Sequence, residues 1–341
     1  MTTTRILVTG GAGFIGSHYV RTLCGAHGPP DVAVTVLDQL THAGDPADLD
    51  DIPDGDRLAF VPGDICDRDL VDGLLAAHDQ VVHFAADHHV DRSAREAEVL
   101  VRTDVLGTQN LVEAALRHGP KRFVHISCDE VYGSIRAGSW SETDPLRPNS
   151  PRAAAKAASD LLALAWHRTH GLDVRVARGS TTYGPRQFPD RLVPLFICRL
   201  LEGRPVLQHG GGHDIRDWLH VDDHVRGIEL IRTLGRPGEV YNIGAGDERS
   251  VRELTGLLLR ACGADWGSVG FRTETERTVH DRRRSVDFTK IRNELGFAPR
   301  GELVTGLMET ADWYRAHRSW WEPRLRRAER CEGRERTPLR P

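Results

Sequence analysis

Residues 6–20 read ILVTGGAGFIGSHYV, and this stretch decides the fold of the chain. It passes from an apolar run typical of a buried strand into a helical pattern, with glycines at the junction. Gly10 permits a tight turn, Gly13 lets the backbone approach a pyrophosphate at the positive helix end, and Gly16 lets the helix pack against the strand. The spacing therefore predicts the phosphate-binding turn of a dinucleotide-binding domain.

Short apolar runs alternate with helical stretches throughout the first half of the chain. This alternation is typical of a parallel sheet with helices on both faces. We therefore predict a Rossmann-like, doubly wound α/β domain. The predicted strands are residues 5–10, 32–38, 58–64, 80–86, 122–127 and 174–179.

The pattern changes near residue 184, where proline- and glycine-rich loops separate shorter helices. We assign residues 1–183 to the nucleotide-binding domain and residues 184–322 mainly to a smaller C-terminal substrate-binding lobe, with later segments crossing back to the first domain. Residues 323–341 are rich in arginine and lack apolar periodicity. We expect a disordered basic tail there, with a basic binding arm as the alternative.

The composition excludes several classes of partner. A net charge of −4 gives no reason to expect nucleic acid or an anionic membrane. No apolar run approaches the roughly 18–20 residues that span a bilayer, and the N-terminus does not have the pattern of a signal peptide. The six cysteines are scattered without metal-site spacing, so we expect reduced thiols, no bound metal and a cytoplasmic location.

The carboxylate that ends the second predicted strand supports the cofactor prediction. Asp38 follows Gly16 by about 20 residues, where a carboxylate binds the adenosine ribose diol of a dinucleotide. It would repel a 2′-phosphate, so we predict NAD rather than NADP. Asp64 and Ile65, after the third strand, suit the adenine edge. The alternative is a nucleotide-binding fold without a bound cofactor.

Several motifs follow the glycine turn in a characteristic order: HFAADHHVDRS (83–93), HISCDEVYG (125–133), TTYGPRQFPDRLVPL (181–195), IRDWLHVDDH (215–224), EVYNIGAG (239–246) and HDRRRSVD (280–287). In this order they resemble the extended short-chain dehydrogenases, and most closely the dTDP-glucose 4,6-dehydratases, over about residues 5–320. The resemblance implies bound NAD, a nucleotide-sugar substrate with dTDP-hexose favoured, and a homodimer formed through helices near 99–118 and 150–169.

The resemblance also implies the chemistry. In that family NAD takes a hydride from C4 of the hexose while a tyrosine takes the hydroxyl proton. A glutamate then removes the C5 proton, an aspartic acid protonates the departing C6 hydroxyl, and the hydride returns to C6. Asp129 and Glu130 match this acid/base pair, and adjacent carboxylates suit it because their environments can separate their pKa values.

The remaining site residues are carried over from the same resemblance. The predicted catalytic residues are Cys128, Asp129, Glu130, Arg152 and Lys156. The predicted cofactor contacts are Gly10, Gly13, Phe14, Ile15, Gly16, Asp38, Gln39, Leu40, Thr41, Asp64, Ile65, Phe84, Ala85, Ala86, Asp104 and Lys156. The predicted substrate contacts are His88, Thr181, Thr182, Arg191, Leu192, Arg216, Asn242, Arg277 and His280, in which the arginines suit phosphate oxygens through bidentate hydrogen bonds.

Four departures from the family pattern cluster at the chemistry. Arg152 stands where the tyrosine is expected, Cys128 replaces the hydroxyl residue that supports it, and Asp104 replaces an asparagine. Thr181–Thr182 replaces an asparagine pair. Arginine stays protonated at physiological pH and cannot serve as the base.

Three interpretations remain open from the sequence. The first is a 4,6-dehydratase in which His88, Cys128 or Glu130 takes the proton, with Asp104 as a compensating charge. The second is an epimerase or related keto-sugar or uronate enzyme, in which Arg152 stabilises an enolate or holds a carboxylate while Glu130 or Cys128 moves a proton. Nearby cations could depress the pKa of the Cys128 thiol for this role, with a buried, inert thiol as the alternative. The third is a non-catalytic NAD or nucleotide-sugar binding protein. A pathway for the modified sugar of an antibiotic or other secondary metabolite fits the first two.

Overall fold

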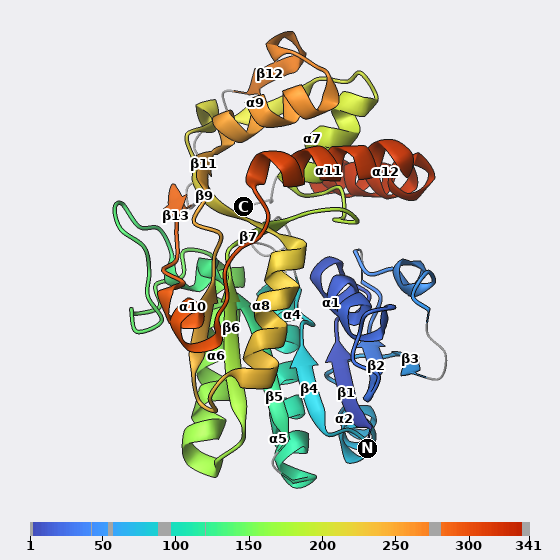
Figure 1. Ribbon diagram of the computed structural model, residues 1–341, viewed down its shortest axis with the longest axis vertical. Coiled ribbons are helices and arrows are strands. Elements are labelled where there is room, and N and C mark those ends of the chain that lie inside the picture. The colour runs from blue at the N-terminus through green and yellow to red at the C-terminus, as the bar shows by residue number, and fades with distance from the viewer. Residues whose placement is uncertain are drawn as a thin grey trace.

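A seven-stranded parallel sheet forms the centre of the molecule (Figure 1). The computed structural model describes residues 3–41, 43–53, 57–87, 97–119, 121–272 and 281–335. The predicted Rossmann-like α/β fold is confirmed. In spatial order the strands are β10 (Val240–Ile243), β6 (Val174–Gly179), β5 (Arg122–Cys128), β4 (Gln80–His83), β1 (Thr4–Thr9), β2 (Val32–Asp38) and β3 (Leu58–Pro62).

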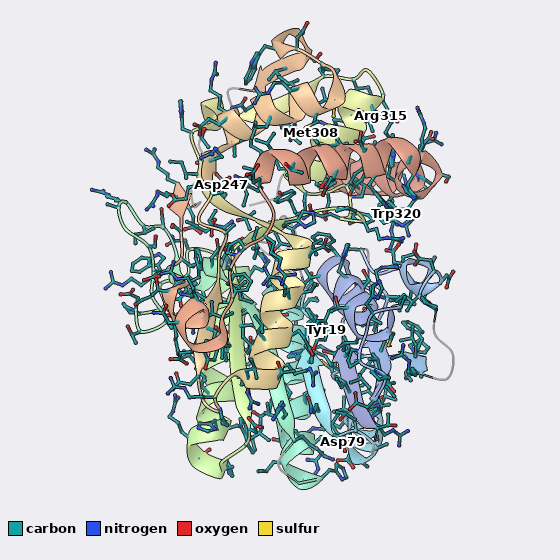
Figure 2. All side chains as sticks on the ribbon, in the orientation of Figure 1. Tyr19, Asp79, Asp247, Met308, Arg315 and Trp320 are labelled. Atoms are coloured by element: carbon teal, nitrogen blue, oxygen red, sulfur yellow. The ribbon has the colours of Figure 1, made fainter. Side chains whose placement is uncertain are left out.

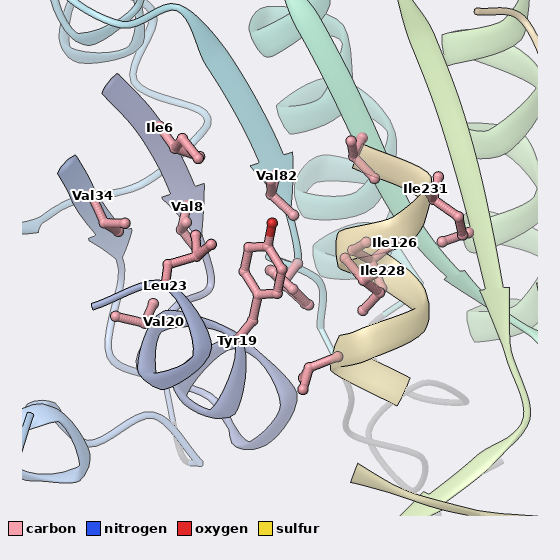
Figure 3. Packing of buried hydrophobic residues seen from close by; sticks show 14 of the residues in the cluster. Ile6, Val8, Tyr19, Val20, Leu23, Val34, Val82, Ile126, Ile228 and Ile231 are labelled. Carbon is pink, nitrogen blue, oxygen red and sulfur yellow. The ribbon is translucent and has the colours of Figure 1, made fainter. Parts of the chain in front are cut away.

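Both faces of the sheet are covered by helices. Successive residues of β1 point to opposite faces, so Ile6 and Val8 join one apolar cluster and Leu7 joins the other. The first cluster, shown in Figure 3, lies under α1 (Phe14–Cys24) and α8 (Val221–Leu234). The second lies under three helices, which are α2 (Arg68–Ala76), α5 (Thr108–Arg117) and α6 (Pro151–His170). Each fully buried aliphatic side chain contributes about 1.5–3 kcal/mol of burial free energy.

The smaller lobe, at the top of Figure 1, has an apolar core of its own. This second core is separate from the two apolar clusters that cover the faces of the main sheet. Its helices are α7 (Leu192–Leu201), α9 (Val251–Cys262), α11 (Leu303–Ala316) and α12 (Arg318–Glu335). Short strands accompany them: β7 (Thr181–Tyr183), β8 (Val206–His209), β9 (Ile215–His220), β11 (Glu248–Ser250), β12 (Val269–Arg272) and β13 (Arg283–Arg284). β10 returns from beyond residue 184 to the main sheet.

The remaining elements are short. They are α4 (Ala97–Leu100), the π-helix η3 (Val101–Gly107), α10 (Thr289–Leu295), and the 3₁₀ turns η1 (Pro46–Leu49), η4 (Asp129–Tyr132), η5 (Gly210–Gly212) and η6 (Trp266–Ser268). Within the described ranges, no helix combines the length and apolar character needed to cross a membrane.

The C-terminal segment differs from the prediction. Residues 323–335 continue helix α12, so the expectation of disorder is wrong for them, and residues 336–341 lie outside the described part of the chain. Trp321 and Leu325 are each 1% exposed within the second core. The other residues of α12 are mostly charged. The helix is held in place because Trp321 and Leu325 pack in the second core with residues from distant parts of the chain.

Candidate active site

The glycine turn has the predicted geometry. Gly10 has φ +71°, and a Cβ on it would lie 2.6 Å from Ala85 N. A Cβ on Gly16 would lie 2.3 Å from Gly10 O, so the close packing of α1 on the turn requires glycine. Gly13 precedes α1 in an extended conformation, with Gly10 O at 3.3 Å as the nearest atom to an added Cβ. The first turn of α1, with Phe14 and Ile15, therefore presents its amide groups at an open face.

Asp38 ends β2 beside this turn. Its Oδ2 accepts a hydrogen bond from Ala12 N at 3.0 Å, and its Oδ1 accepts one from Leu40 N at 2.8 Å. Leu40 has a positive φ of 55°, so Gln39 to Thr41 turn sharply after the strand. Burial raises the pKa of Asp38, while the two backbone donors oppose that rise. The carboxylate is thus fixed next to the glycine turn.

The next two strand ends complete this edge of the sheet. Asp64 follows β3 and accepts a hydrogen bond from Cys66 N at 2.8 Å. Ile65 fills the space left by Gly107, where an added Cβ would lie 2.4 Å from Ile65 Cδ1. After β4, Phe84 N donates to Thr9 O at 2.9 Å, which lays residues 84–86 against the glycine turn. The structure therefore brings the described members of the predicted cofactor set, from Gly10 to Ala86, to the carboxyl ends of β1–β4.

The predicted acid/base pair follows β5 in the turn η4. Glu130 is held by two guanidinium groups, because Arg152 bonds to Oε2 and Arg284 Nη1 lies 2.5 Å from Oε1. The same Arg284 nitrogen lies 3.4 Å from Asp129 Oδ1. Asp129 is 3% exposed, and its Oδ2 has no hydrogen-bond partner among the described residues. The two carboxylates thus share one cation but differ in environment.

The electrostatics of this cluster limit what each group can do. Burial raises the pKa of Asp129 and that of the Cys128 thiol. Of the two alternatives for Cys128, the raised pKa supports the buried, inert thiol, because burial outweighs the nearby Arg152 charge. Burial lowers the pKa of Arg152 to about 10, which leaves the guanidinium protonated at neutral pH. Neither the thiol nor the guanidinium is suited to accept a proton there.

Asp104 is a buried carboxyl group whose charge interacts with those of Arg152 and Lys156. It belongs to the wide π-helical turn η3, and its Oδ1 accepts a hydrogen bond from Asp87 N at 3.0 Å. The side chain is 2% exposed, and burial raises its pKa to about 6, although Lys156, the Asp87 amide and Arg152 lower it. Asp104 therefore supplies a buried carboxyl group close to two cations, as the compensating-charge hypothesis requires.

Helix α6 holds Arg152 and Lys156 one turn apart at its N-terminal end. Ser150 caps the helix by accepting a hydrogen bond from Ala153 N. Further along, Asp160 Oδ2 accepts from Arg178 Nε at 2.9 Å, and His125 Nε2 lies 3.2 Å from Asp160 Oδ1. Burial alone would raise the pKa of Asp160, but Arg178 and His125 lower it to about 2. This ionic anchor fixes the helix to strands β5 and β6.

The predicted substrate residues are only partly brought together. Arg284 Nη2 donates to Thr181 Oγ1 at 3.2 Å, and the charge of Arg191 acts on Arg152. Burial and the neighbouring Arg284 lower the pKa of Arg216 to about 10. Thr182 instead lies 2.8 Å from His224 Nδ1, and Leu192 packs against the second core. His88, Arg277 and His280 lie outside the described residues.

Asn242 contradicts its predicted role. Its side chain is fully buried, its Oδ1 accepts a hydrogen bond from Tyr132 at 2.9 Å, and its Nδ2 donates to Trp140 O and Asp287 O at 3.0 and 3.1 Å. These bonds leave the amide no donor for a nucleotide. Asn242 ties the edge strand β10 to the segments beside the site, which is a structural role.

Comparisons with known proteins show to which family this chain belongs. The family model described as GDP-mannose 4,6 dehydratase matches residues 7–310. The dTDP-glucose 4,6-dehydratase of Streptomyces griseus is 59% identical over 321 residues, which cover 94% of this chain and 97% of that relative. The chain belongs to this family of nucleotide-sugar dehydratases.

Solved structures of relatives give the same fold. DesIV, a dTDP-glucose 4,6-dehydratase from Streptomyces venezuelae solved with NAD bound, has a TM-score of 0.90 and 52% identity, covering 94% of this chain and 100% of that chain. A UDP-glucuronic acid 4-epimerase from Bacillus cereus, solved with UDP-glucuronic acid and NAD, has a TM-score of 0.84 and 28% identity, covering 92% of this chain and 99% of that chain. The dehydratase fold therefore also serves epimerases.

Arg284 contacts both carboxylates of the candidate site but was not among the residues predicted from the sequence. The motif HDRRRSVD was recognised, but three consecutive arginines give no sign of which one faces the site. The strand pairing decides it, because Arg284 pairs with Arg216 on β9 and is 8% exposed beside the two carboxylates. The only sequence signal for it is that successive side chains of a strand such as β13 point to opposite faces, so that one of two neighbouring arginines faces inward.

Proposed function

We propose that the protein is an NAD-dependent nucleotide-sugar 4,6-dehydratase acting on a dTDP-hexose. The observation that carries this proposal is the paired carboxylates at the end of β5. Asp129 is buried with a raised pKa, which suits an acid that holds its proton. Glu130 is instead paired with two guanidinium groups, while one Asp129 oxygen has no hydrogen-bond partner among the described residues. Two adjacent carboxyl groups with opposed environments are what an elimination across C5 and C6 needs.

The residues around the glycine turn fit NAD. Gly13 leaves the start of α1 open to a pyrophosphate, and Asp38 is fixed where a ribose diol would bind. When bound, NAD would accept the C4 hydride and supply it again at C6. Glu130 would remove the C5 proton, and Asp129 would protonate the departing C6 hydroxyl. Lys156 would bind the nicotinamide ribose.

We assign the C4 hydroxyl proton to Asp104 rather than to position 152. The Arg152 guanidinium stays charged, and burial raises the pKa of the Cys128 thiol. Asp104 is the carboxyl group whose charge interacts with both Arg152 and Lys156, and its pKa of about 6 suits a general base near neutral pH. Arg152 would then stabilise negative charge on the C4 oxygen.

The test is mass spectrometry of dTDP-glucose after incubation with the protein and NAD in heavy water. The expected product has lost one water and carries solvent deuterium. Asp129→Asn serves as the matched control, because it keeps the size of the side chain and removes the acid. An unchanged sugar with the wild-type protein, together with measurable NAD binding, would overturn the proposed reaction.

A second candidate is favoured by the ion pair between Arg152 and Glu130. A guanidinium beside the C5 base is placed to stabilise an enolate of a sugar that already carries a 4-keto group. An epimerase of this kind would exchange the C5 hydrogen without losing water. Incubation of dTDP-4-keto-6-deoxyglucose in heavy water separates the candidates, because deuterium uptake into this sugar with no dehydration of dTDP-glucose supports the epimerase.

We infer a homodimer formed through the helices near α4, η3 and α6. Apolar side chains are unusually exposed on these neighbouring elements: Val99, Val101, Leu106 and Leu161 are 41–55% exposed. A shared apolar patch of this kind favours burial against a second copy of the chain. Sedimentation of Leu161→Glu should give a smaller species than the wild type, and an unchanged mass would count against this interface.

We also infer that the protein works in a reducing compartment such as the cytoplasm. Cys24, Cys66, Cys128, Cys198 and Cys262 are free thiols. Unpaired cysteines in this number fit a compartment that keeps thiols reduced. Fractionation of the producing cells, followed by detection of the protein, tests the location directly, and recovery from the extracellular fraction would oppose it.

A further inference from the structure

The C-terminal helix α12 contacts the turn of residues 44–49, which follows β2. Arg324 Nη2 bonds to Asp45 and lies 3.5 Å from Asp48 Oδ1. Trp320 Nε1 donates to the same Asp48 oxygen at 2.5 Å. Figure 2 shows Trp320 on the side of α12 that faces the N-terminal part of the chain. A helix from the substrate lobe thus bonds to a turn of the nucleotide-binding domain.

That turn is linked through Ala12 to Asp38, one of the predicted cofactor residues. Asp45 N donates to Ala12 O at 3.2 Å, and Ala12 N donates to Asp38 Oδ2 at 3.0 Å. A Cβ on Gly44 would lie 3.2 Å from Asp38 Oδ1, which shows how closely the turn passes the ribose-binding carboxylate. The contacts therefore run from α12 through Asp45 and Ala12 to the glycine turn and Asp38.

The contact between α12 and the turn is partly buried, although Asp45 itself is 38% exposed. The Arg324 side chain is 14% exposed, and its guanidinium carbon lies 4.1 Å from the centre of the Trp320 ring. Asp48 is 4% exposed, so its two partners satisfy a carboxylate that is shielded from water. Trp321 and Leu325, each 1% exposed, hold the helix in the second core. An ordered anchor of this kind pre-organises the turn that it contacts.

We propose that Trp320 and Arg324 are positioning residues. They keep the turn of residues 44–49, and through it Asp38, in place at the adenosine end of the cofactor site. This inference rests on the proposed function, because a dehydratase returns the hydride to the substrate and so needs its NAD to stay bound through the whole cycle. Neither residue touches the reacting atoms. Their effect is on the retention of NAD, through the turn of residues 44–49 and Asp38.

Calorimetric titration of NAD into the purified full-length protein tests this proposal. Arg324→Ala should weaken NAD binding by about 10- to 100-fold, because a partly buried charged hydrogen bond and the order of the turn are lost together. Arg326→Ala is the matched control, since Arg326 lies on the same helix, is 67% exposed and pairs with Glu322. Its NAD affinity should equal that of the wild type.

A second ligand separates positioning from general loosening. Titration of dTDP reports on the substrate lobe, and Arg324→Ala should leave its affinity within about twofold. Trp320→Phe keeps an aromatic ring but removes the bond to Asp48, and it should weaken NAD binding less than Arg324→Ala does. Arg324→Lys should bind NAD more tightly than Arg324→Ala but more weakly than the wild type.

The outcomes are distinct. Unchanged NAD affinity in Arg324→Ala, or equal losses for NAD and dTDP, would overturn the positioning role. Failure of the wild-type protein itself to bind NAD would instead overturn the proposed function. If Arg324→Ala does not fold, Trp320→Phe carries the test, and NAD affinity equal to the wild type in that variant would overturn the proposal.

Discussion

The two ends of the active site are built under different constraints. At the cofactor end, Gly10 and Gly16 are fixed by backbone contacts that any side chain would break. At the reacting end, Arg152 and Glu130 meet through long side chains that are 11% and 20% exposed. These two residues meet through side-chain atoms, so a substitution there does not meet the backbone contacts that constrain the two glycines. The comparison teaches that the fold can keep its nucleotide site intact while the chemistry beside it diverges.

The most damaging change is expected at the cofactor end. Gly16→Val would place a Cβ 2.3 Å from Gly10 O, so α1 must move away from β1. We expect a loss of more than about 3 kcal/mol in the free energy of unfolding, together with loss of NAD binding. Thermal unfolding and NAD titration measure both.

A glycine elsewhere in the same domain provides the control. Gly73 lies within α2, and an added Cβ there would have no neighbour within 4 Å. Gly73→Ala should stabilise the protein by about 0.5–1 kcal/mol. If Gly16→Val and Gly73→Ala had equal stability, the constraint on the cofactor end would be refuted.

At the reacting end, Glu130→Gln should lower turnover by about 10²- to 10⁴-fold, because the proposed C5 base is lost. NAD affinity should stay unchanged, which sharpens the contrast between the two ends. Steady-state rates and NAD titration give the two readouts. Glu113→Gln, on the surface of α5 beside Arg68, is the control and should retain full activity. Normal C5 exchange in Glu130→Gln would contradict the assigned role.

The Asp104 assignment predicts a rescue. Asp104→Asn should slow C4 oxidation by about 10²-fold, and adding Arg152→Tyr should restore most of it by returning a titratable hydroxyl to position 152. Single-turnover formation of reduced cofactor measures this step. A double variant as slow as Asp104→Asn would show that position 152 no longer faces the C4 hydroxyl.

The smallest effect concerns stability and pH. Burial raises the pKa of Asp104 from 3.8 to about 6, so between these values the native state binds this proton more tightly than the unfolded chain. The contribution of Asp104 to the free energy of unfolding therefore falls as pH rises through that window. Asp104→Asn should gain up to about 3 kcal/mol relative to the wild type as pH rises from about 4 to about 6, with no further gain above that window. Denaturant unfolding of the cofactor-free proteins measures the gain, and parallel pH curves would contradict it.

The parts of the fold that sequence could predict are those defined by local patterns. Apolar runs located β1–β6, and the glycine spacing located the turn before α1, because both depend on neighbours in the chain. Helix α12 was missed because Trp320 and Arg324 bond to Asp48 and Asp45, more than 270 residues earlier in the chain. Its apolar residues 321, 325 and 328 do have helical spacing, which arginine-rich surroundings concealed.

The site was predictable to a similar degree. Asp38 could be located because it ends a predicted strand, whereas Asp129 and Glu130 were located through the resemblance of HISCDEVYG to the dehydratase family. The role of Asn242 was misjudged, since sequence does not reveal that Tyr132, Trp140 and Asp287 already occupy its amide. The pairing of Arg284 with Glu130 also depends on a long-range contact between η4 and β13.

The direction in which the Asp104 side chain leaves the helix depends on the π-helical turn η3. Each residue of an ordinary α-helix advances by about 100°, and a π-turn absorbs one additional residue without breaking the helix. Deleting a single residue between 101 and 107 would return the segment to regular pitch and swing Asp104 away from Lys156 by about that angle. For this segment the length of the chain, more than the identity of any one residue, decides where the carboxylate points.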